Sequence, residues 1–396
     1  MRKNILFVID SLECAGAEKS LVTLLSLLDY SKFKVDLMLF THGKMLEEFV
    51  PQEVKILNPL EYTDFTLLNL KEAFLHSSRN LNFKMLSARL KYSIKIRMNK
   101  YNSAQEARIY WQNVSKVIRN NSKKYDIAIS YGQGVPTFYV AEKVQSKKKF
   151  AWVNTSFRLN TKERDYQMFF YDKFNKIVTV SDSAQEIFLE TFPNYIYKTE
   201  VIYDINNYEF IYNLSRSGKT FDDYFEGVRI LTIGRLANEK GYDIALKACK
   251  KLKESGINFR WYVLGKGYLE DEILNYIKEN GLADHFILLG VTPNPYPFIK
   301  NSDIYVQTSK FEGFGLAIAE ARMLNIPVVT TRFDSVFNQI TDGKNGLVVD
   351  MTGDAVCNGI IELINNVELR ESIVNYLKNE TKGNSEEINK FYQLIG

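Results

Sequence analysis

The sequence has few of the residues that build metal and redox sites. Its 396 residues include three cysteines and three histidines, scattered without the close pairs of a metal-binding or redox motif. Long apolar runs are also missing, because no stretch approaches the roughly 20 residues that span a bilayer. The apolar run 5–9 is too short for a secretory signal and is closed by Asp10. These absences predict a cytoplasmic protein in a reducing environment, whose chemistry uses no metal cluster.

Length and composition are those of a globular protein. Hydrophobic residues make up 45% of the chain and charged residues 25%, which allows well-packed cores and argues against disorder. A chain of this length is long enough for two domains, each with its own core.

Positive charge is concentrated in the segment 84–124. It holds eleven Lys or Arg and a single acidic residue, Glu106, so the rest of the chain is net negative although the total is +4. Apolar and aromatic residues are mixed with these charges, as in segments that dock on anionic membranes at roughly 1 kcal/mol per basic residue. A solvated helix face explains the same pattern equally well. Nucleic acid also attracts such charge, but we expect the membrane and no nucleic acid as partner.

Short apolar runs alternate with helical patterns along the chain. In the first half we expect strands at 5–9, 35–40, 127–130, 150–153 and 177–180. A second series follows at 228–234, 261–264, 286–289, 303–308, 327–330 and 347–349. Such alternation predicts an α/β fold with parallel sheets covered by helices, and with ligands at the carboxyl ends of the strands.

The two series predict two Rossmann-like domains that face each other across a cleft. We expect an N-terminal domain at 1–205 and a second domain at 206–375; the family resemblance given below implies that the first binds an acceptor and the second a nucleotide-sugar. The polar stretch 206–225 is the expected linker region, and a final helix within 376–396 is expected to pack back on the first domain.

The stretch 310–321 carries the central motif of the sequence. Two glycines flank Phe314 directly after the expected strand 303–308, and good helix formers follow from Leu316. Glycine allows unusual backbone angles and close approach of a ligand. The free N–H groups at a helix start, with the helix dipole, then favour a phosphate.

Two carboxylates flank this predicted phosphate site. Glu312 lies in the loop and Glu320 in the early helix. A carboxylate is a poor neighbour for phosphate but accepts hydrogen bonds from sugar hydroxyls, so the pair indicates a nucleotide-sugar. Two surface glutamates on an ordinary βα unit remain the alternative.

Arg235 and Lys240 follow another expected strand end, in the same layer as the Glu312 loop. Arginine binds phosphate with a planar fork and lysine as a compact charge, so together they could neutralise a diphosphate. Gly265 and Gly267 mark a third strand end where backbone could approach a ligand. Taken alone, the two cations are better explained as solvated surface charges, but their position in the same layer as the Glu312 loop favours the phosphate site.

Several motifs together resemble the retaining glycosyltransferases of family 4, which have the GT-B fold. In the second half these are Gly234-Arg-Leu with Glu239-Lys-Gly241, and Glu312-Gly-Phe-Gly followed by Glu320-Ala321. In the first half, Ala15-Gly16-Ala17-Glu18 is similar to the family's Gly-Gly-Ala-Glu loop. The segment 294–300 resembles one common in enzymes that build bacterial capsule and other surface polysaccharides.

The resemblance implies roles for individual residues. Arg235 and Lys240 would bind the donor diphosphate and stabilise the departing nucleotide, with Glu312 as the third catalytic residue, holding hydroxyls of the transferred sugar. The expected donor-binding residues are Gly16, Asn154, Gly265, Val291, Phe314, Gly315, Leu316 and Glu320. No cofactor and no metal are implied, since the acceptor hydroxyl attacks on the face from which the diphosphate leaves and a phosphate oxygen takes the proton.

One position departs from the family pattern. Family members commonly read Trp-Ile-His-Thr-Asp after the strand at 150–153, whereas this chain reads Trp152-Val-Asn-Thr-Ser156. The Asn154 amide can hydrogen-bond a sugar hydroxyl but cannot take up a proton. This puts the donor sugar, the acceptor side or activity itself in question.

Three hypotheses follow. The first is a retaining, metal-independent transferase that moves a sugar from a nucleotide-sugar, most simply a UDP-sugar, to a lipid-linked oligosaccharide on the cytoplasmic face of the membrane. The second is an inactive nucleotide-sugar-binding homologue or partner subunit. The third is another GT-B chemistry such as epimerisation, for which no clear acid and base groups are found.

Overall fold

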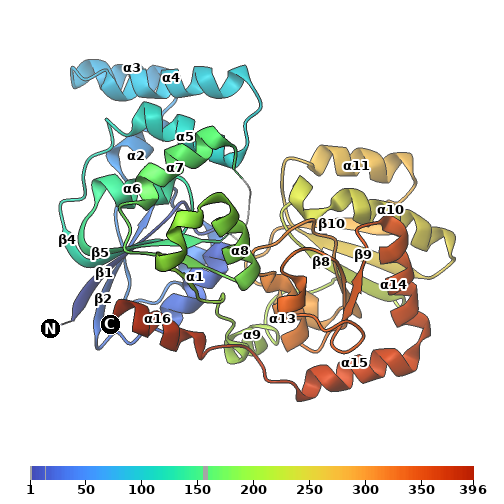
Figure 1. Ribbon diagram of the computed structural model, residues 1–396. Helices are drawn as coiled ribbons and strands as arrows, with labels where there is room; N and C mark the ends of the chain where they lie inside the picture. Colours follow the sequence, from blue (N-terminus) through green and yellow to red (C-terminus); the bar gives the residue numbers. More distant parts are fainter. Residues whose placement is uncertain (1, 14, 155–158) are drawn as a thin grey trace. The chain divides into compact units, whose positions relative to one another are not determined.

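The computed structural model describes residues 2–13, 15–154 and 159–396, and the chain forms two compact units (Figure 1). Of the described residues, the first unit consists of 2–13, Ala17–Ile202 and Lys390–Gly396, and the second of 15–16 and Tyr203–Asn389.

The first unit is built on a sheet of seven parallel strands in the order β3-β2-β1-β4-β5-β6-β7. The strands are β1 (Lys3–Ile9), β2 (Phe33–Leu39), β3 (Lys55–Ile56), β4 (Lys124–Ser130), β5 (Gln145–Val153), β6 (Lys176–Thr179) and β7 (Thr199–Val201). Its helices are α1 (Gly16–Ser26), α2 (Glu61–Leu67), α3 (Leu70–Arg79), α4 (Lys84–Met98), α5 (Ser103–Val114), α6 (Val135–Lys143), α7 (Thr161–Tyr171) and α8 (Asp182–Thr191).

The apolar run of β1 explains its place in the interior of this sheet. Residues Ile5–Ile9 are all buried, and Phe7 lies in register with Leu37 of β2 and Ile129 of β4. A continuous apolar run suits a parallel strand covered on both faces, since neither set of alternating side chains meets water.

The second unit repeats this arrangement with six parallel strands in the order β10-β9-β8-β11-β12-β13. The strands are β8 (Val228–Ile233), β9 (Phe259–Leu264), β10 (Phe286–Gly290), β11 (Ile304–Gln307), β12 (Val328–Thr331) and β13 (Leu347–Val349). Its helices are α9 (Tyr208–Leu214), α10 (Tyr242–Glu254), α11 (Glu270–Glu279), α12 (Tyr296–Lys300), α13 (Leu316–Met323), α14 (Gly353–Asn365) and α15 (Val367–Asn379).

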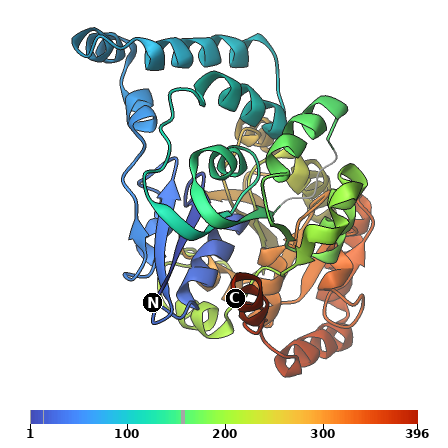
Figure 2. The ribbon, with the colours of Figure 1, turned by 60° about the vertical axis from the view of Figure 1, so that its left-hand side comes forward.

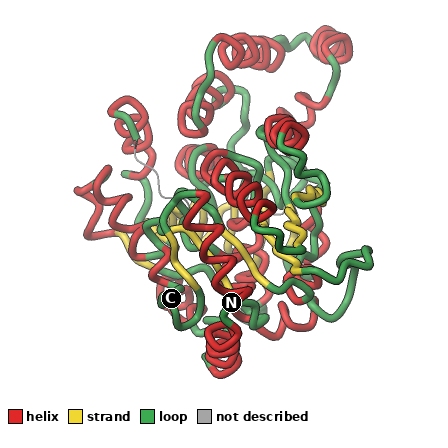
Figure 3. Tube along the Cα trace, turned by 90° about the vertical axis from the view of Figure 1, so that its right-hand side faces the viewer, coloured by secondary structure: helices red, strands yellow, loops and turns green. Residues whose placement is uncertain are grey.

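The strand order of each sheet reverses at one point, between β1 and β4 in the first unit and between β8 and β11 in the second. Helices cover both faces of the sheets (Figures 1 and 3). In doubly wound sheets the loops at such a reversal form a crevice at the carboxyl ends of the strands, where ligands bind. The predicted α/β class and the pair of Rossmann-like sheets are confirmed.

The last helix, α16 (Glu387–Ile395), returns the chain to the first unit. Phe391 stacks on Phe7 of β1 with ring centroids 6.1 Å apart, and Tyr392 stacks on Phe33 of β2 at 5.9 Å. The Lys3 ammonium donates to the Ile395 carbonyl at 3.0 Å. These contacts attach the C-terminal segment to β1 and β2 of the first sheet.

The basic segment predicted at 84–124 forms α4, α5 and the first residue of β4. Among the described residues, no helix combines the length and the hydropathy that crossing a bilayer requires.

Candidate functional site

The candidate site is built from two loops at the strand reversal of the second sheet. One loop follows β8 and carries Arg235 and Lys240; the other follows β11 and carries Glu312. Because β8 and β11 are hydrogen-bonded neighbours, their carboxyl ends bring these loops together.

The loop after β8 approaches the loop after β11 so closely that glycine is required. Gly241 has φ +66°, and a Cβ there would lie 2.0 Å from the Thr308 carbonyl oxygen. The Thr308 hydroxyl donates to the Lys240 carbonyl at 2.9 Å, and the Lys310 amide donates to the Glu239 carbonyl at 2.8 Å. These bonds fix the backbone of Lys240 beside the second loop.

The loop after β11 is held from its other side by two residues near the β12 end. The Ser335 hydroxyl donates to the Glu312 carbonyl at 2.9 Å, and the Gln339 amide donates to the carbonyls of Phe314 and Gly315. Gly315 caps α13 in the left-handed conformation, with φ +85°. Leu316 is the first residue of that helix, so its start is positioned by these bonds.

Lys240 and Glu312 form an ion pair at the centre of the site. Lys240 Nζ lies 2.5 Å from Glu312 Oε1, and the side chains are only 22% and 12% exposed. The absence of a side chain at Gly234 leaves room for the lysine stem, since a Cβ there would lie 3.3 Å from Lys240 Cδ. Limited solvent access strengthens a charge-assisted hydrogen bond of this kind.

Three donors converge on the same carboxylate oxygen of Glu312. Besides Lys240, Gln307 Nε2 donates to Oε1 at 2.9 Å and Ser309 Oγ at 2.6 Å. No described residue donates to Oε2 of Glu312. One oxygen is thus anchored by the protein while the other can accept a hydrogen bond from a ligand hydroxyl.

Gln307 is oriented in turn by Tyr305. The Tyr305 hydroxyl donates to Gln307 Oε1 at 2.5 Å, which directs the amide nitrogen toward Ser309 at 2.7 Å and toward Glu312. Burial raises the pKa of the Tyr305 hydroxyl well above its ordinary value, so it remains a donor. No prediction from the sequence covers this role of Gln307, although a glutamine at the end of an otherwise apolar buried strand was an available signal.

Arg235 does not join Lys240 at the carboxylate. Its guanidinium forms an ion pair with Glu239, one turn further along its own loop, and its side chain is 66% exposed. Of the two predicted cations, the structure therefore brings only Lys240 together with Glu312.

Glu320 lies within α13 and is almost fully buried, with 2% exposed. The Tyr296 hydroxyl of α12 donates to its Oε1 at 3.1 Å. Glu312 and Glu320 thus belong to one loop-and-helix unit, and each has a neighbouring side chain that orients it.

Close packing between loops requires glycine at position 265, whether or not a ligand binds there. A Cβ there would lie 1.9 Å from the Gly234 carbonyl oxygen, and one at Gly267 would lie 2.2 Å from that of Leu236. The loop after β9 therefore lies directly against the loop that carries Lys240. Val291 follows the last residue of β10, the edge strand, and is half-buried.

Two predicted residues follow strands of the first sheet. Gly16 begins α1, after the loop that follows β1, and is grouped with the second unit. Asn154 follows β5, where its Nδ2 donates to the Tyr131 carbonyl at 3.1 Å while its Oδ1 is buried without a described partner. The neighbouring Thr155 and Ser156 lie outside the described residues. The unpaired oxygen can accept a hydrogen bond from a ligand hydroxyl.

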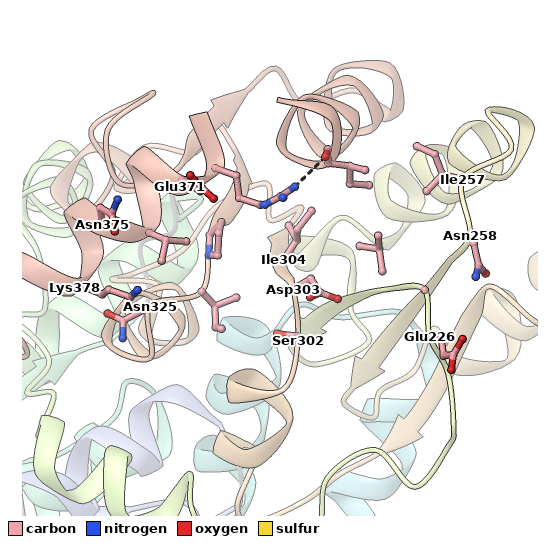
Figure 4. A pocket seen from close by; sticks show the side chains of 17 residues that line it. Glu226, Ile257, Asn258, Ser302, Asp303, Ile304, Asn325, Glu371, Asn375 and Lys378 are labelled. Atoms are coloured by element: carbon pink, nitrogen blue, oxygen red, sulfur yellow. Dashed lines mark hydrogen bonds between the residues drawn. The ribbon is translucent and has the colours of Figure 1, made fainter. Parts of the chain in front are cut away.

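A cavity of 1010 Å³ lies elsewhere in the second unit (Figure 4). Its lining includes Val228, Asn258, Asp303 and Pro327, which lie at or beside the amino ends of four strands. The candidate site lies at the opposite, carboxyl edge and shares no residue with this cavity. Within the described ranges, no group of three or more His, Cys, Asp or Glu is arranged to hold a metal ion.

The chain is similar to known glycosyltransferases. Residues 225–380 match the family model described as "Glycosyl transferases group 1", and this range lies within the second unit and includes Arg235, Lys240, Glu312 and Glu320. The chain also aligns over 99% of its length with two crystal structures of low identity, which establishes the fold. HepE of Anabaena, solved with UDP and glucose, has a TM-score of 0.68 at 17% identity, and a TarM variant of S. aureus, solved with UDP among its ligands, has 0.65 at 14%. The match covers 99% of each of those chains as well.

The chain is also similar in sequence to glycosyltransferases of named function. The chain is 28% identical over 214 residues to the Campylobacter jejuni enzyme named N-acetylgalactosamine-N,N'-diacetylbacillosaminyl-diphospho-undecaprenol 4-alpha-N-acetylgalactosaminyltransferase, covering 54% of this chain and 57% of that one. It is 29% identical over 147 residues to CapM of Staphylococcus aureus, a capsular polysaccharide biosynthesis glycosyltransferase, covering 36% and 38%. The chain spans about half the length of the curated relatives it matches. The predicted resemblance to GT-B glycosyltransferases of surface polysaccharide synthesis is confirmed.

Proposed function

We propose that this protein is a glycosyltransferase that moves a sugar from a UDP-sugar to a hydroxyl of a lipid-linked oligosaccharide, with retention of anomeric configuration and without a metal ion. The observation that supports this most is the meeting of Lys240 and Glu312 at the strand reversal of a group 1 glycosyltransferase module. A cation suits a diphosphate, and a half-satisfied carboxylate suits sugar hydroxyls.

In the proposed reaction the acceptor hydroxyl attacks the anomeric carbon as the bond from that carbon to the diphosphate oxygen breaks. The hydroxyl proton passes to the departing phosphate oxygen, so the products are a glycoside and a nucleoside diphosphate. Lys240 stabilises the charge that develops on the diphosphate, and such preorganised charge is a large contribution to catalysis. Arg235 lies on an exposed loop and would assist by turning from Glu239 to the phosphates.

The remaining residues hold the donor. Glu312 Oε2 would accept a hydroxyl of the transferred sugar, and Glu320 the hydroxyls of the ribose. The backbone of Phe314, Gly315 and Leu316 would meet the distal phosphate or sugar, with Gly265 and Val291 near the nucleoside. Gly16 and Asn154 would also contribute to donor binding, Asn154 through its unpaired Oδ1.

The names of the relatives support an inference about the acceptor and about the location of the protein in the cell. The Campylobacter jejuni relative is named for a diphospho-undecaprenol acceptor and the Staphylococcus aureus relative for capsule synthesis. We infer an acceptor of the same chemical class and a peripheral position on the cytoplasmic face of the membrane.

The test is release of UDP from UDP-sugars in the presence of lipid-linked oligosaccharide extracts. We expect release that depends on the acceptor, persists in EDTA, and falls strongly in Lys240→Ala. Full activity in that variant would refute the assignment, and loss of activity in EDTA would refute a metal-independent reaction.

A second function is favoured by one observation, the asparagine at position 154 where the related pattern has histidine. The chain would then be a nucleotide-sugar-binding protein or an inactive partner of another transferase. Such a protein would bind the donor in calorimetry but would release no UDP with any acceptor extract. A transferase would bind the donor and also release UDP.

A further inference from the structure

Helices α3 and α4 form the outer layer of the first unit. They lie beyond α2 and α5, on the side away from the sheet (Figures 1 and 2). The first turns of α4 pack inward through Met85, Leu86 and Ala88, all buried. The rest of α4 and most of α3 lie on the surface of the unit.

An apolar stripe runs along the exposed half of α4. Leu90, Ile94 and Met98 are 42%, 62% and 71% exposed. Their spacing of four residues places all three on one face of the helix. A face of this kind in a surface helix normally turns toward a core, but here it is left uncovered.

The stripe continues onto α3. Leu70 and Phe74 lie one turn apart on that helix and are 61% and 56% exposed. Phe74 contacts Phe83, at the start of α4, with ring centroids 6.0 Å apart. Phe83 is 46% exposed and lies seven residues before Leu90, so it joins the two stripes into one surface.

The turn between the helices adds an unusual feature. Leu81 adopts the left-handed backbone conformation, with φ 48°, and its side chain is 88% exposed. Glycine or asparagine is the ordinary choice at such a helix end, because a larger side chain is strained there. The chain thus tolerates local strain at a position where the leucine side chain contributes nothing to its core.

Positive charge is concentrated in the same segment as this apolar surface. Residues 67–100 contain eight Lys or Arg and a single acidic residue, Glu72. Lys91, Lys95 and Arg97 border the stripe on α4, are exposed, and form no ion pair with any described residue. By contrast α5, also in the predicted basic segment, buries Ile109, Trp111 and Val114, so it cannot offer them to a partner.

We propose that the α3–α4 hairpin, residues 67–100, is the surface by which this protein docks on an anionic lipid bilayer. Apolar side chains would enter the boundary between headgroups and acyl chains, and the basic residues would contact the headgroup phosphates. The inference extends the proposed function, because a lipid-linked acceptor lies at such a surface. The excess of unpaired cations favours a lipid surface over a second copy of this chain, which would bring like charges together.

The experiment is flotation of the full chain with vesicles of phosphatidylcholine alone, or of equal parts phosphatidylcholine and phosphatidylglycerol. We expect binding to the mixed vesicles, weakened by salt. The double variant Leu90→Ser, Ile94→Ser should reduce that binding about tenfold or more. The matched control Ile196→Ser, Tyr197→Ser removes two side chains that are even more exposed on the same unit, and it should bind as the wild type does.

A second pair of variants tests the charges. Neutralising Lys91, Lys95 and Arg97 to Gln should remove the preference for anionic vesicles, whereas neutralising Lys247, Lys250 and Lys278 in the second unit should not.

Vesicle binding equal to that of the wild type in both hairpin variants would overturn the proposal. The proposal would also be overturned if neither the wild type nor Leu90→Ser, Ile94→Ser bound vesicles while light scattering showed a wild-type dimer and a monomeric variant. That result would assign the surface to contact with a second copy of the chain. Donor binding by calorimetry should be unchanged in all these variants, so failure of docking is distinguishable from failure of the proposed function.

Discussion

Lys240 and Glu312 are 72 residues apart in the sequence, and their charged atoms lie 2.5 Å apart in the structure. They meet because β8 and β11 are neighbours at the point where the strand order of the second sheet reverses. A cation and a carboxylate held together at such an edge are suited to a ligand with both phosphate and hydroxyl groups.

Glu312→Ala should weaken transfer about tenfold to a hundredfold, since it removes a charged hydrogen-bond acceptor for the sugar. Glu312→Gln keeps an oxygen that can accept from a hydroxyl, so its loss should be smaller. Steady-state kinetics with the donor varied would measure both. Equal, undiminished kcat/KM in the two variants would contradict a role for this side chain in sugar binding.

Gln307→Leu should lower kcat/KM about tenfold or more although Gln307 is assigned no ligand contact, because Glu312 would lose one of the bonds that orient it. The control is Tyr305→Phe, which removes only the hydroxyl that orients Gln307 and should have a weaker effect in the same direction. Melting temperatures would be recorded in parallel. If activity falls only in proportion to lost stability, Gln307 is a structural residue and not a positioning one.

Gly265→Ala should destabilise the second unit by about 1–3 kcal/mol, the usual cost of forcing extra volume into a packed site. The added methyl would lie 1.9 Å from the Gly234 carbonyl oxygen. Gly132→Ala is the matched control, because its Cβ would meet Pro136 at an ordinary 3.7 Å. Thermal unfolding would measure both, and equal melting temperatures would show that the loops can separate without cost.

Asn154→Asp should lower the melting temperature at neutral pH. The Nδ2 donor to the Tyr131 carbonyl would be replaced by a carboxylate oxygen facing that carbonyl, and the buried oxygen would become charged without a partner. Asn154→Ala only removes the bond and should cost less. A charged variant as stable as the wild type would mean that the amide is not held as described.

The sequence predicted the strands and glycine loops well because their signals are local. The run 303–308 predicted β11 to within one residue at each end, and the glycines flanking Phe314 marked the turn into α13. Side-chain partners were harder to predict. Arg235 pairs with Glu239, whereas Lys240 pairs with Glu312. This choice of partners depends on how two loops pack against each other, and no local sequence pattern predicts that packing.

The basic segment shows the same limit. Its charge was evident by counting, but the sequence did not distinguish α4, with its exposed stripe, from α5, whose Trp111 is buried in the core. Both helices mix apolar and basic residues, and only tertiary packing decides which apolar face is covered. Exposed Leu70 and Phe74 of α3 lie outside the segment defined by charge.

The most direct test of the central claim is calorimetric titration of UDP and of a UDP-sugar into the wild type, Lys240→Ala and Glu312→Ala. The account predicts that Lys240→Ala weakens binding of both ligands about tenfold to a hundredfold, as expected for a lost charged contact. It predicts that Glu312→Ala weakens the UDP-sugar more than UDP. Unchanged affinities for both ligands in both variants would contradict it.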